Sequence, residues 1–251
     1  MELQDQRVLV TGATAGIGQE AAKLFARRGA SVVITGRDTE RGAQTVAAIE
    51  AEGGRAEFIA ADLNDIKSVR RLAEQADEVD VLINNAAATR TPFAPTLEQN
   101  VESFDTIFDV NVRAPFFLTA ALLPKMIARG SGAIVNISTM YASVGVANAP
   151  VVAAAKAALE SFTRSWAAAF GANGIRVNTV APGPTRTDGA VGAFADGLEQ
   201  LGSATPLGPD RGPERDRRGD RFPRVAASEL RHRRDRSGGW RLYRDLTKRT
   251  A

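Results

Sequence analysis

The stretch LVTGATAGIGQEAAKLFARRG, residues 9–29, decides the fold of this chain. It begins as an apolar strand, passes through Gly12, Gly16 and Gly18, and continues as an amphipathic helix. Glycines between a strand and a helix allow a tight turn and a close approach of the backbone to a pyrophosphate. The helix N-terminus then offers free N–H groups and a favourable dipole. The stretch predicts a dinucleotide-binding turn, and the alternative is a turn with a structural role only.

Apolar runs alternate with amphipathic segments over the first 180 residues. Strands are expected at RVLVT (7–11), SVVITG (31–36), AEFIAA (56–61), VDVLINN (79–85), GAIVNIS (132–138) and IRVNTVAP (175–182). Helices are expected at 16–28, 38–52, 65–77, 98–128 and 151–170, with a bend or break in the fourth at Pro115 and Pro124. Mostly apolar strands that alternate with helices are typical of the α/β class. We therefore expect one domain with a doubly wound parallel sheet, the Rossmann fold.

Composition narrows the functional classes. Hydrophobic residues make up 44% of the 251 residues, which is ample for a core. The chain has no cysteine, which excludes disulfides and cysteine-based metal sites, and no metal site is predicted. No apolar run is expected to approach the roughly 18 residues of a membrane span, and the N-terminus enters a strand pattern directly. A cytoplasmic protein without a membrane partner is expected.

Five motifs occur in order along the chain: TGATAGIG (11–18), NNAA (84–87), NISTM (136–140), AAAKAAL (153–159) and VAPGPTRT (180–187). Together they resemble the classical short-chain dehydrogenases/reductases, and the resemblance covers residues 5 to about 208. It implies a domain that binds NAD(H) or NADP(H) and transfers hydride between the nicotinamide and a small carbonyl or alcohol substrate. The cofactor-binding residues it implies are Gly12, Thr14, Gly16, Ile17, Gly18, Asp62, Leu63, Asn84, Ala86, Lys156, Pro182, Gly183 and Thr187.

The end of the second strand, VVITGRD (32–38), bears on the choice of cofactor. Relatives that prefer NAD carry an acidic residue there, which binds the ribose 2′-hydroxyl. This chain has Gly36 and then Arg37, whose guanidinium can pair with the 2′-phosphate of NADP. We therefore expect NADP rather than NAD, although Ala15 replaces a basic residue that many NADP users carry. The alternative is a solvated arginine at the start of a helix.

The resemblance also implies a proton relay, and one of its positions is changed. Asn111, Thr139 and Lys156 match the asparagine, hydroxyl and lysine positions, with Ser138 as the fallback for the hydroxyl. The tyrosine acid should lie four residues before the lysine and 13 after the hydroxyl residue. Both rules lead to Val152, which has no proton to give. We expect impaired carbonyl reduction. The alternative is a non-catalytic dinucleotide-binding protein or a decayed gene product.

One further residue bears on the expected loss of activity, and two helices bear on assembly. Tyr141 lies two residues after Thr139 and could replace the missing phenol; the alternative is an aromatic residue lining the cleft. The resemblance implies a homodimer through helices 98–128 and 151–170, and a tetramer is not expected.

The C-terminal segment differs in character from the rest. Residues 209–251 contain 14 Lys+Arg and 7 Asp+Glu, whereas residues 1–208 contain 18 basic and 22 acidic residues. A one-base shift lets RHRRD (231–235) encode VTGAI and GGWRLY (238–243) encode VDGGY, which resemble the end of the family's sequences. We therefore hypothesise a Rossmann domain over 1–208, without the usual last strand, and an irregular, out-of-frame basic tail over 209–251. Interleaved acidic residues argue against nucleic-acid binding by this tail.

Overall fold

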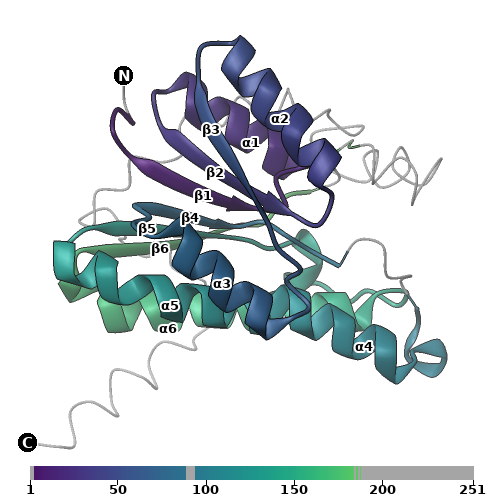
Figure 1. The fold of residues 1–251 in the computed structure, drawn as a ribbon. Coiled ribbons are helices and arrows are strands. Elements are labelled where there is room, and N and C mark those ends of the chain that lie inside the picture. The colour runs from purple at the N-terminus through teal and green to yellow at the C-terminus, as the bar shows by residue number, and fades with distance from the viewer. Residues whose placement is uncertain (1–2, 89–93, 184, 186, 188–251) are drawn as a thin grey trace, which may run out of the picture. The chain divides into compact units, whose positions relative to one another are not determined.

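A computed structural model describes residues 3–88, 94–183, 185 and 187 of the chain. Within these residues, six parallel strands form one sheet in the order β3-β2-β1-β4-β5-β6 (Figure 1). The strands are β1 Arg7–Thr11, β2 Ser31–Gly36, β3 Arg55–Ala60, β4 Val81–Asn84, β5 Gly132–Ile137 and β6 Ile175–Val180. The strand order changes direction between β1 and β4, as in a doubly wound sheet. The predicted fold class is confirmed.

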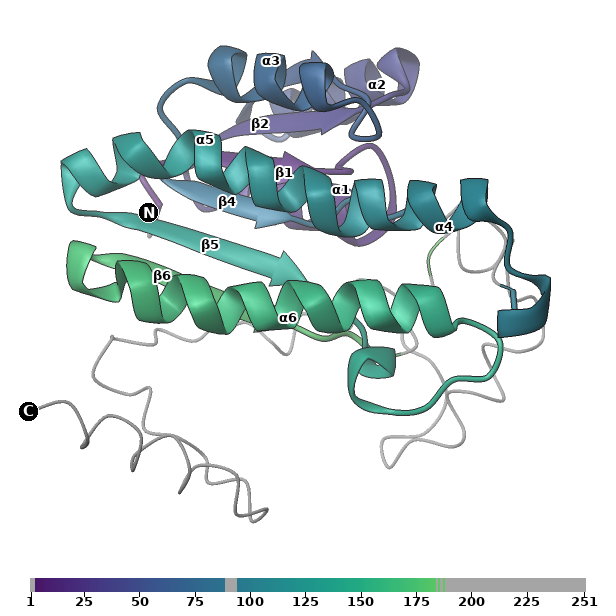
Figure 2. The ribbon, with the colours of Figure 1, turned by 90° about the horizontal axis from the view of Figure 1, so that it is seen from below.

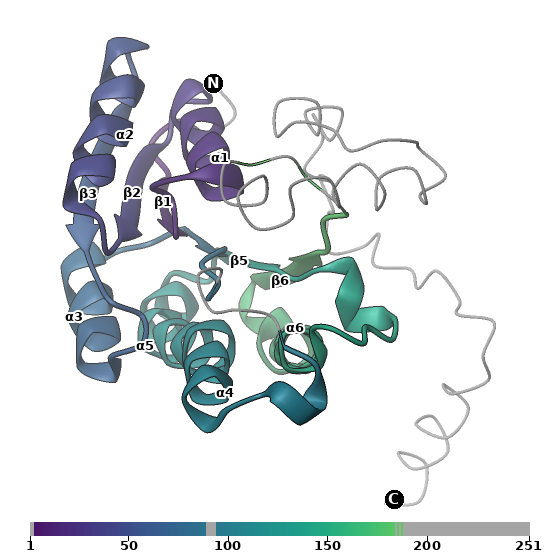
Figure 3. The same cartoon turned by 90° about the vertical axis from the view of Figure 1, so that its right-hand side faces the viewer.

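Helices cover both faces of the sheet. Helices α1 (Gly16–Arg27) and α2 (Thr39–Ala51) lie on one face, and α3 (Ile66–Ala76), α5 (Ala114–Arg129) and α6 (Pro150–Phe170) lie on the other (Figure 3). Side chains alternate between the faces: Val8 and Val10 pack with the α1 core, whereas Leu9 packs with the α3–α5 core. Because both faces are buried, the strands are apolar along their length, which is why they could be recognised in the sequence.

The long apolar segment before β5 is interrupted. It contains η1 (Thr96–Glu98), α4 (Val101–Phe108), a π-helical turn, η2 (Asp109–Arg113), and α5. Pro115 is the second residue of α5 and has no N–H for the carbonyl of Asn111 one turn earlier, which accounts for the irregular turn there. The helix continues through Pro124, where no break occurs. The carbonyl that Pro124 leaves without a donor belongs to Ala120, which is exposed to solvent.

The run Val101–Arg129 corrects one sequence expectation. By length and composition alone, this segment of the described chain could cross a membrane, whereas the sequence reading expects no such run. However, 44% of its most apolar window is buried inside the fold. Leu118, Leu122 and Met126 belong to the core on this face of the sheet. Figure 2 shows α5 and α6 lying side by side over β4, β5 and β6, as expected of core helices.

In the described part of the chain, β6 is the last strand and lies at the edge of the sheet. It is reached from α6 through η4 (Gly171–Asn173) and pairs with β5 from Gly132↔Ile175 to Ile137↔Val180. The hypothesised boundary at residue 208 and the tail 209–251 lie outside the described residues.

Candidate active site

The glycine-rich turn after β1 lies directly against the chain that leaves β4. Gly12 has φ +64°, and a Cβ atom there would be 2.8 Å from the Cα atom of Ala86. At Gly18 a Cβ atom would be 2.3 Å from Nδ2 of Asn85 and 2.5 Å from the carbonyl oxygen of Gly12. Both positions therefore require glycine, and the two chain segments meet where the strand order changes direction.

Thr11 and Asn85 hold these two segments together. The Thr11 hydroxyl accepts hydrogen bonds from the N–H groups of Asn85 and Ala86, both at 3.0 Å. Asn85 Nδ2 donates to the carbonyl oxygens of Thr11 and Gly12, at 2.8 and 3.1 Å. These hydrogen bonds were not predicted from the sequence. The available signals were a threonine at the end of an apolar strand and the second asparagine of NNAA.

The first turn of α1 faces this junction and has no side-chain cap. The N-cap residue is Ala15, and the N–H groups of the first turn have no carbonyl one turn earlier within the helix. Thr187 lies beside this turn, because a Cβ atom at Gly16 would be 3.3 Å from its Cγ2. We call the turn that contains Gly12, Gly16 and Gly18, closed by the Asn85 amide, the glycine cradle. The cradle and the helix N-terminus without a side-chain cap together fit the pyrophosphate of a dinucleotide.

The end of β2 lies next to the same turn. A Cβ atom at Gly36 would be 2.8 Å from Cγ2 of Thr14. Arg37 follows and is exposed. The acidic neighbour of Arg37 is engaged with its own helix: Asp38 Oδ1 accepts a hydrogen bond from the Arg41 N–H at 3.0 Å and caps α2. Asp38 Oδ2 also lies 3.4 Å from Arg41 Nε.

Other implied cofactor residues lie at the carboxyl ends of the strands, but their side chains differ in direction. Asp62 is exposed after β3, whereas the Leu63 side chain belongs to the hydrophobic core. Leu63 can therefore offer a cofactor only its backbone. The loop after β6 contains Pro182 and Gly183, and the Pro182 carbonyl accepts a hydrogen bond from the Met140 N–H at 3.2 Å.

Asn84 belongs to a buried ladder of polar side chains. Its Nδ2 donates to Oδ1 of Asn136 at 2.9 Å and to the Thr119 hydroxyl at 3.3 Å. Asn136 in turn donates to the hydroxyl of Thr163, which also accepts from Thr179 at 2.7 Å. This ladder crosses β4, β5 and β6 in register and attaches them to α5 and α6. The Asn84 Oδ1, also buried, has no hydrogen-bond partner among the described residues, so the ladder engages only the Nδ2 of this amide.

Lys156 and Thr139 lie near the carboxyl end of β5. Lys156 is 5% exposed, and its Nζ donates to the carbonyl oxygen of Ile137 at 2.7 Å. Burial lowers the pKa of Lys156 to about 8. Thr139 is the N-cap of η3 (Met140–Ser143), and its hydroxyl accepts from the Tyr141 N–H at 3.4 Å. Ser138 is buried, and its hydroxyl donates to Glu160 at 2.6 Å, which leaves Thr139 as the better candidate for a substrate contact.

The remaining relay positions lie on η2, α6 and η3. Asn111 is buried at 1% exposure in η2, and its Oδ1 has no hydrogen-bond partner among the described residues. Val152 is half-buried and packs against a small apolar cluster of Ile107, Val151 and Ala155. Burial raises the pKa of Tyr141, which is the opposite of the shift that a catalytic acid needs. This weakens the case for Tyr141 as a substitute for the missing tyrosine.

The buried ammonium of Lys156 predicts a pH dependence of stability. Its pKa is about 8 in the folded chain, against 10.5 for an unperturbed lysine, so between these values the unfolded chain binds more protons. The free energy of unfolding should therefore rise with pH across this window, by up to roughly 3 kcal/mol. Urea unfolding at several pH values, compared with Lys156→Met, isolates this contribution. Equal slopes for the two proteins would contradict it.

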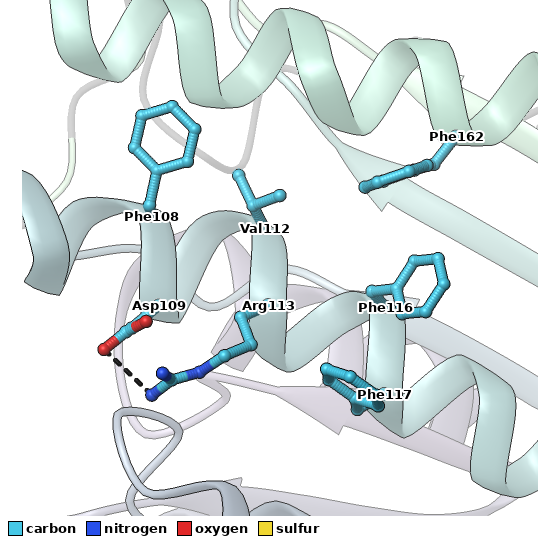
Figure 4. Close-up of a pocket in the computed structure, with 7 residues that line it drawn as sticks. All are labelled: Phe108, Asp109, Val112, Arg113, Phe116, Phe117 and Phe162. Atoms are coloured by element: carbon cyan, nitrogen blue, oxygen red, sulfur yellow. Dashed lines mark ion pairs between the residues drawn. The ribbon is translucent and has the colours of Figure 1, made fainter.

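A separate hollow of about 330 Å³ lies between η2, α5 and α6 (Figure 4). An ion pair between Arg113 and Asp109, at 2.8 Å, lies along its wall. The other lining residues are Phe108, Val112, Phe116, Phe117 and Phe162. Nearby large apolar side chains are exposed, including Val101 at 76% and Phe104 at 42%. This surface coincides with the helices of the predicted homodimer, which stays a prediction.

Comparisons with known proteins agree with this geometry. A family model described as short chain dehydrogenase matches residues 6–196. A cis-4-hydroxycyclohexanecarboxylate dehydrogenase from Sinomonas cyclohexanicum is 39% identical over 211 residues, which cover 82% of this chain and 84% of the relative. A solved short chain dehydrogenase/reductase family protein is 49% identical, with a TM-score of 0.81 over 88% of this chain and 89% of that one.

A second solved structure, with bound NADP at low occupancy, comes from Beutenbergia cavernae and is assigned as an NAD(P)-dependent gluconate 5-dehydrogenase. It is 32% identical, with a TM-score of 0.80 over 85% of this chain and 86% of that one. The strand order, the glycine-rich turn and these matches lead to one conclusion: the chain belongs to the short-chain dehydrogenase family.

Proposed function

We propose that this chain is an NADP(H)-dependent oxidoreductase that acts on a small carbonyl or alcohol substrate, with weakened proton transfer. The observation that carries the proposal is the cradle at the β1–α1 turn, where the Asn85 amide closes onto the backbone of Gly12 beside an uncapped helix N-terminus. The family match supports the oxidoreductase class, and the solved relative with bound NADP supports the cofactor class.

Different residues of the chain would bind different parts of the dinucleotide. The N–H groups of Gly16 and Ile17 would hold the pyrophosphate, with Thr187 beside them. Asp62 and the Leu63 backbone would flank the adenine, while the backbone of Asn84 and Ala86 and the Pro182–Gly183 segment would border the nicotinamide half. When bound, the dinucleotide supplies or accepts the hydride.

Each relay residue would have a separate role in the reaction. Lys156 would hold the nicotinamide ribose, and Thr139 would donate or accept a hydrogen bond at the substrate oxygen. Asn111, whose buried Oδ1 has no partner among the described residues, would hold a water that connects Lys156 to solvent. Val152 leaves this relay without its usual acid, so slow turnover is expected.

Arg37 provides the test of cofactor choice. It follows β2 and is exposed, and its acidic neighbour Asp38 is bound to Arg41. Arg37→Ala should weaken NADPH binding by about 10- to 100-fold, because a hydrogen bond to a charged group contributes about 1.5–3 kcal/mol. NADH binding should change little. Thermal-shift titrations with both cofactors measure the effect.

Arg55→Ala is the matched control, because Arg55 lies at the amino end of the strands, whereas Arg37 follows the carboxyl end of β2. A wild-type protein whose unfolding temperature responds to neither NADPH nor NADH would refute the proposed function. Equal losses of NADPH and NADH affinity in Arg37→Ala would refute only the role of Arg37.

The second candidate function is a non-catalytic dinucleotide-binding protein, and Val152 is the observation that favours it. NADPH binding without any turnover would support it over the first. We also propose that residues 1–208 form the NAD(P)-binding domain, and the family match over residues 6–196 supports the greater part of this range. Sequencing the coding DNA decides whether a one-base shift produced residues 209–251.

A further inference from the structure

Lys156 has hydrogen-bonding capacity that the fold leaves open. Its ammonium has three N–H donors, and the Ile137 carbonyl accepts one of them. In the part of the chain that the structure describes, no carboxylate pairs with Lys156. Glu160, one turn further along α6, instead accepts a hydrogen bond from Ser138 at 2.6 Å. The buried ammonium therefore keeps two donors for a ligand.

The position of Lys156 places these donors at the ligand edge of the sheet. Ile137 is the last residue of β5, and Thr139 follows it two residues later. Ligands of open parallel sheets bind at the carboxyl ends of the strands. One turn earlier on α6, Val152 has neither a hydroxyl group nor the length of a phenol. No acid on that turn stands between Lys156 and a substrate oxygen.

We propose that Lys156 itself donates the proton during carbonyl reduction by this chain. The inference rests on the proposed function, which supplies the hydride from a reduced nicotinamide dinucleotide. The carbonyl carbon gains the hydride, the C=O π bond breaks, and the oxygen takes a proton from Nζ. The products are an alcohol, an oxidised dinucleotide and a neutral amine at Lys156, which regains its proton from solvent.

The electrostatics of the site suit this role. Burial lowers the pKa of Lys156 to about 8, so the ammonium is largely protonated at neutral pH yet is a stronger acid than an exposed lysine. Burial is the cause of the shift, and among the described residues no neighbouring charge contributes to it. Charged residues of α4 and α5 are exposed. The other titratable groups on α6 and on the elements packed against it are Glu160, Arg164, Asp109, Arg113, Tyr141 and Arg176.

Substitution of Lys156 separates its charge from its acidity. Lys156→Arg keeps a positive charge for the cofactor ribose, but the pKa of a guanidinium is so high that it holds its proton throughout the neutral range. With NADPH and a generic ketone, wild-type kcat should fall as pH rises through about 8. Lys156→Arg should lose at least about tenfold in kcat and lose this pH dependence. NADPH titration of the same variant separates any loss of cofactor affinity from the loss of proton transfer.

A second readout does not require turnover. The lysines of the chain are Lys23, Lys67, Lys125, Lys156 and Lys248, few enough for side-chain NMR. In the cofactor-free protein, one lysine signal should titrate near pH 8, and it should be missing in Lys156→Met. The methionine side chain has a volume similar to that of lysine. Lys156→Met therefore provides the comparison with the wild-type protein if Lys156→Arg does not fold.

Several results would overturn the inference. An unchanged kcat in Lys156→Arg would do so, as would a Lys156 signal that titrates no lower than the other lysines. A wild-type protein that binds NADPH but does not reduce the ketone, while Val152→Tyr does, would remove the inference and favour the non-catalytic candidate. A wild-type protein that reduces the ketone with the same kcat as Lys156→Arg would remove the inference and leave the proposed function standing. Absence of NADPH binding in both proteins would remove the two together.

Discussion

Val152→Tyr should raise kcat for ketone reduction by about 10²-fold. The substituted residue lies one turn before Lys156 on α6, so a phenol there shares a helix face with the buried ammonium. A positive charge nearby lowers the pKa of a phenol and makes it a better acid. General acid catalysis typically contributes 10²–10⁴-fold, and Lys156 already supplies part of that in the wild-type protein. NADPH oxidation with a generic ketone measures the gain.

Val152→Phe is the control for this result, because it adds the ring without the hydroxyl. The Val152 side chain packs against the cluster of Ile107, Val151 and Ala155, and both variants add a ring at this same place. Thermal unfolding with and without NADPH verifies that each variant folds and binds. A wild-type kcat equal to that of Val152→Tyr, or an equal gain in Val152→Phe, would show that the missing phenol does not limit catalysis.

Gly18→Ala should remove most of the affinity for NADPH. Its Cβ atom would be 2.5 Å from the Gly12 carbonyl oxygen and 2.3 Å from Asn85 Nδ2, so the amide that closes the cradle must move. Overpacking of this kind costs about 1–3 kcal/mol of stability. We expect about a hundredfold weaker NADPH binding, equivalent to roughly 3 kcal/mol. Thermal unfolding measures the first effect and NADPH titration the second.

Gly171→Ala is the matched substitution. Gly171 has φ −58° at the end of α6, and a Cβ atom there meets nothing within 4 Å. It should leave stability and NADPH affinity close to those of the wild-type protein. If Gly18→Ala bound NADPH as tightly as Gly171→Ala, the cradle would not be the dinucleotide site.

The backbone architecture followed from local sequence to within a residue or two at most element ends. Runs such as RVLVT and SVVITG coincide with β1 and β2, because strands buried on both faces are apolar along their length. The Asp38 and Asp65 caps mark the beginnings of α2 and α3. The interruption at 109–113 lies earlier than the predicted break at Pro115, because a proline affects the carbonyl one turn earlier.

The directions of the side chains at the site could not be predicted from local sequence. Asn84 and Asn85 are adjacent in the sequence, yet one joins the buried ladder and the other closes the cradle. Which of them faces the core depends on the register of β4 against β1 and β5, which is a property of the assembled sheet. The shifted pKa of Lys156 likewise depends on the depth at which α6 buries it.

The strand order also determines when the cradle can be completed during synthesis. Residues 7–60 contain β1, α1, β2, α2 and β3, which are neighbours in space and can associate as soon as they leave the ribosome. The Thr11 hydroxyl, however, accepts from N–H groups 74 and 75 residues later. The nascent half-sheet therefore emerges with an unpaired strand edge at β1, which stays open until β4 is translated.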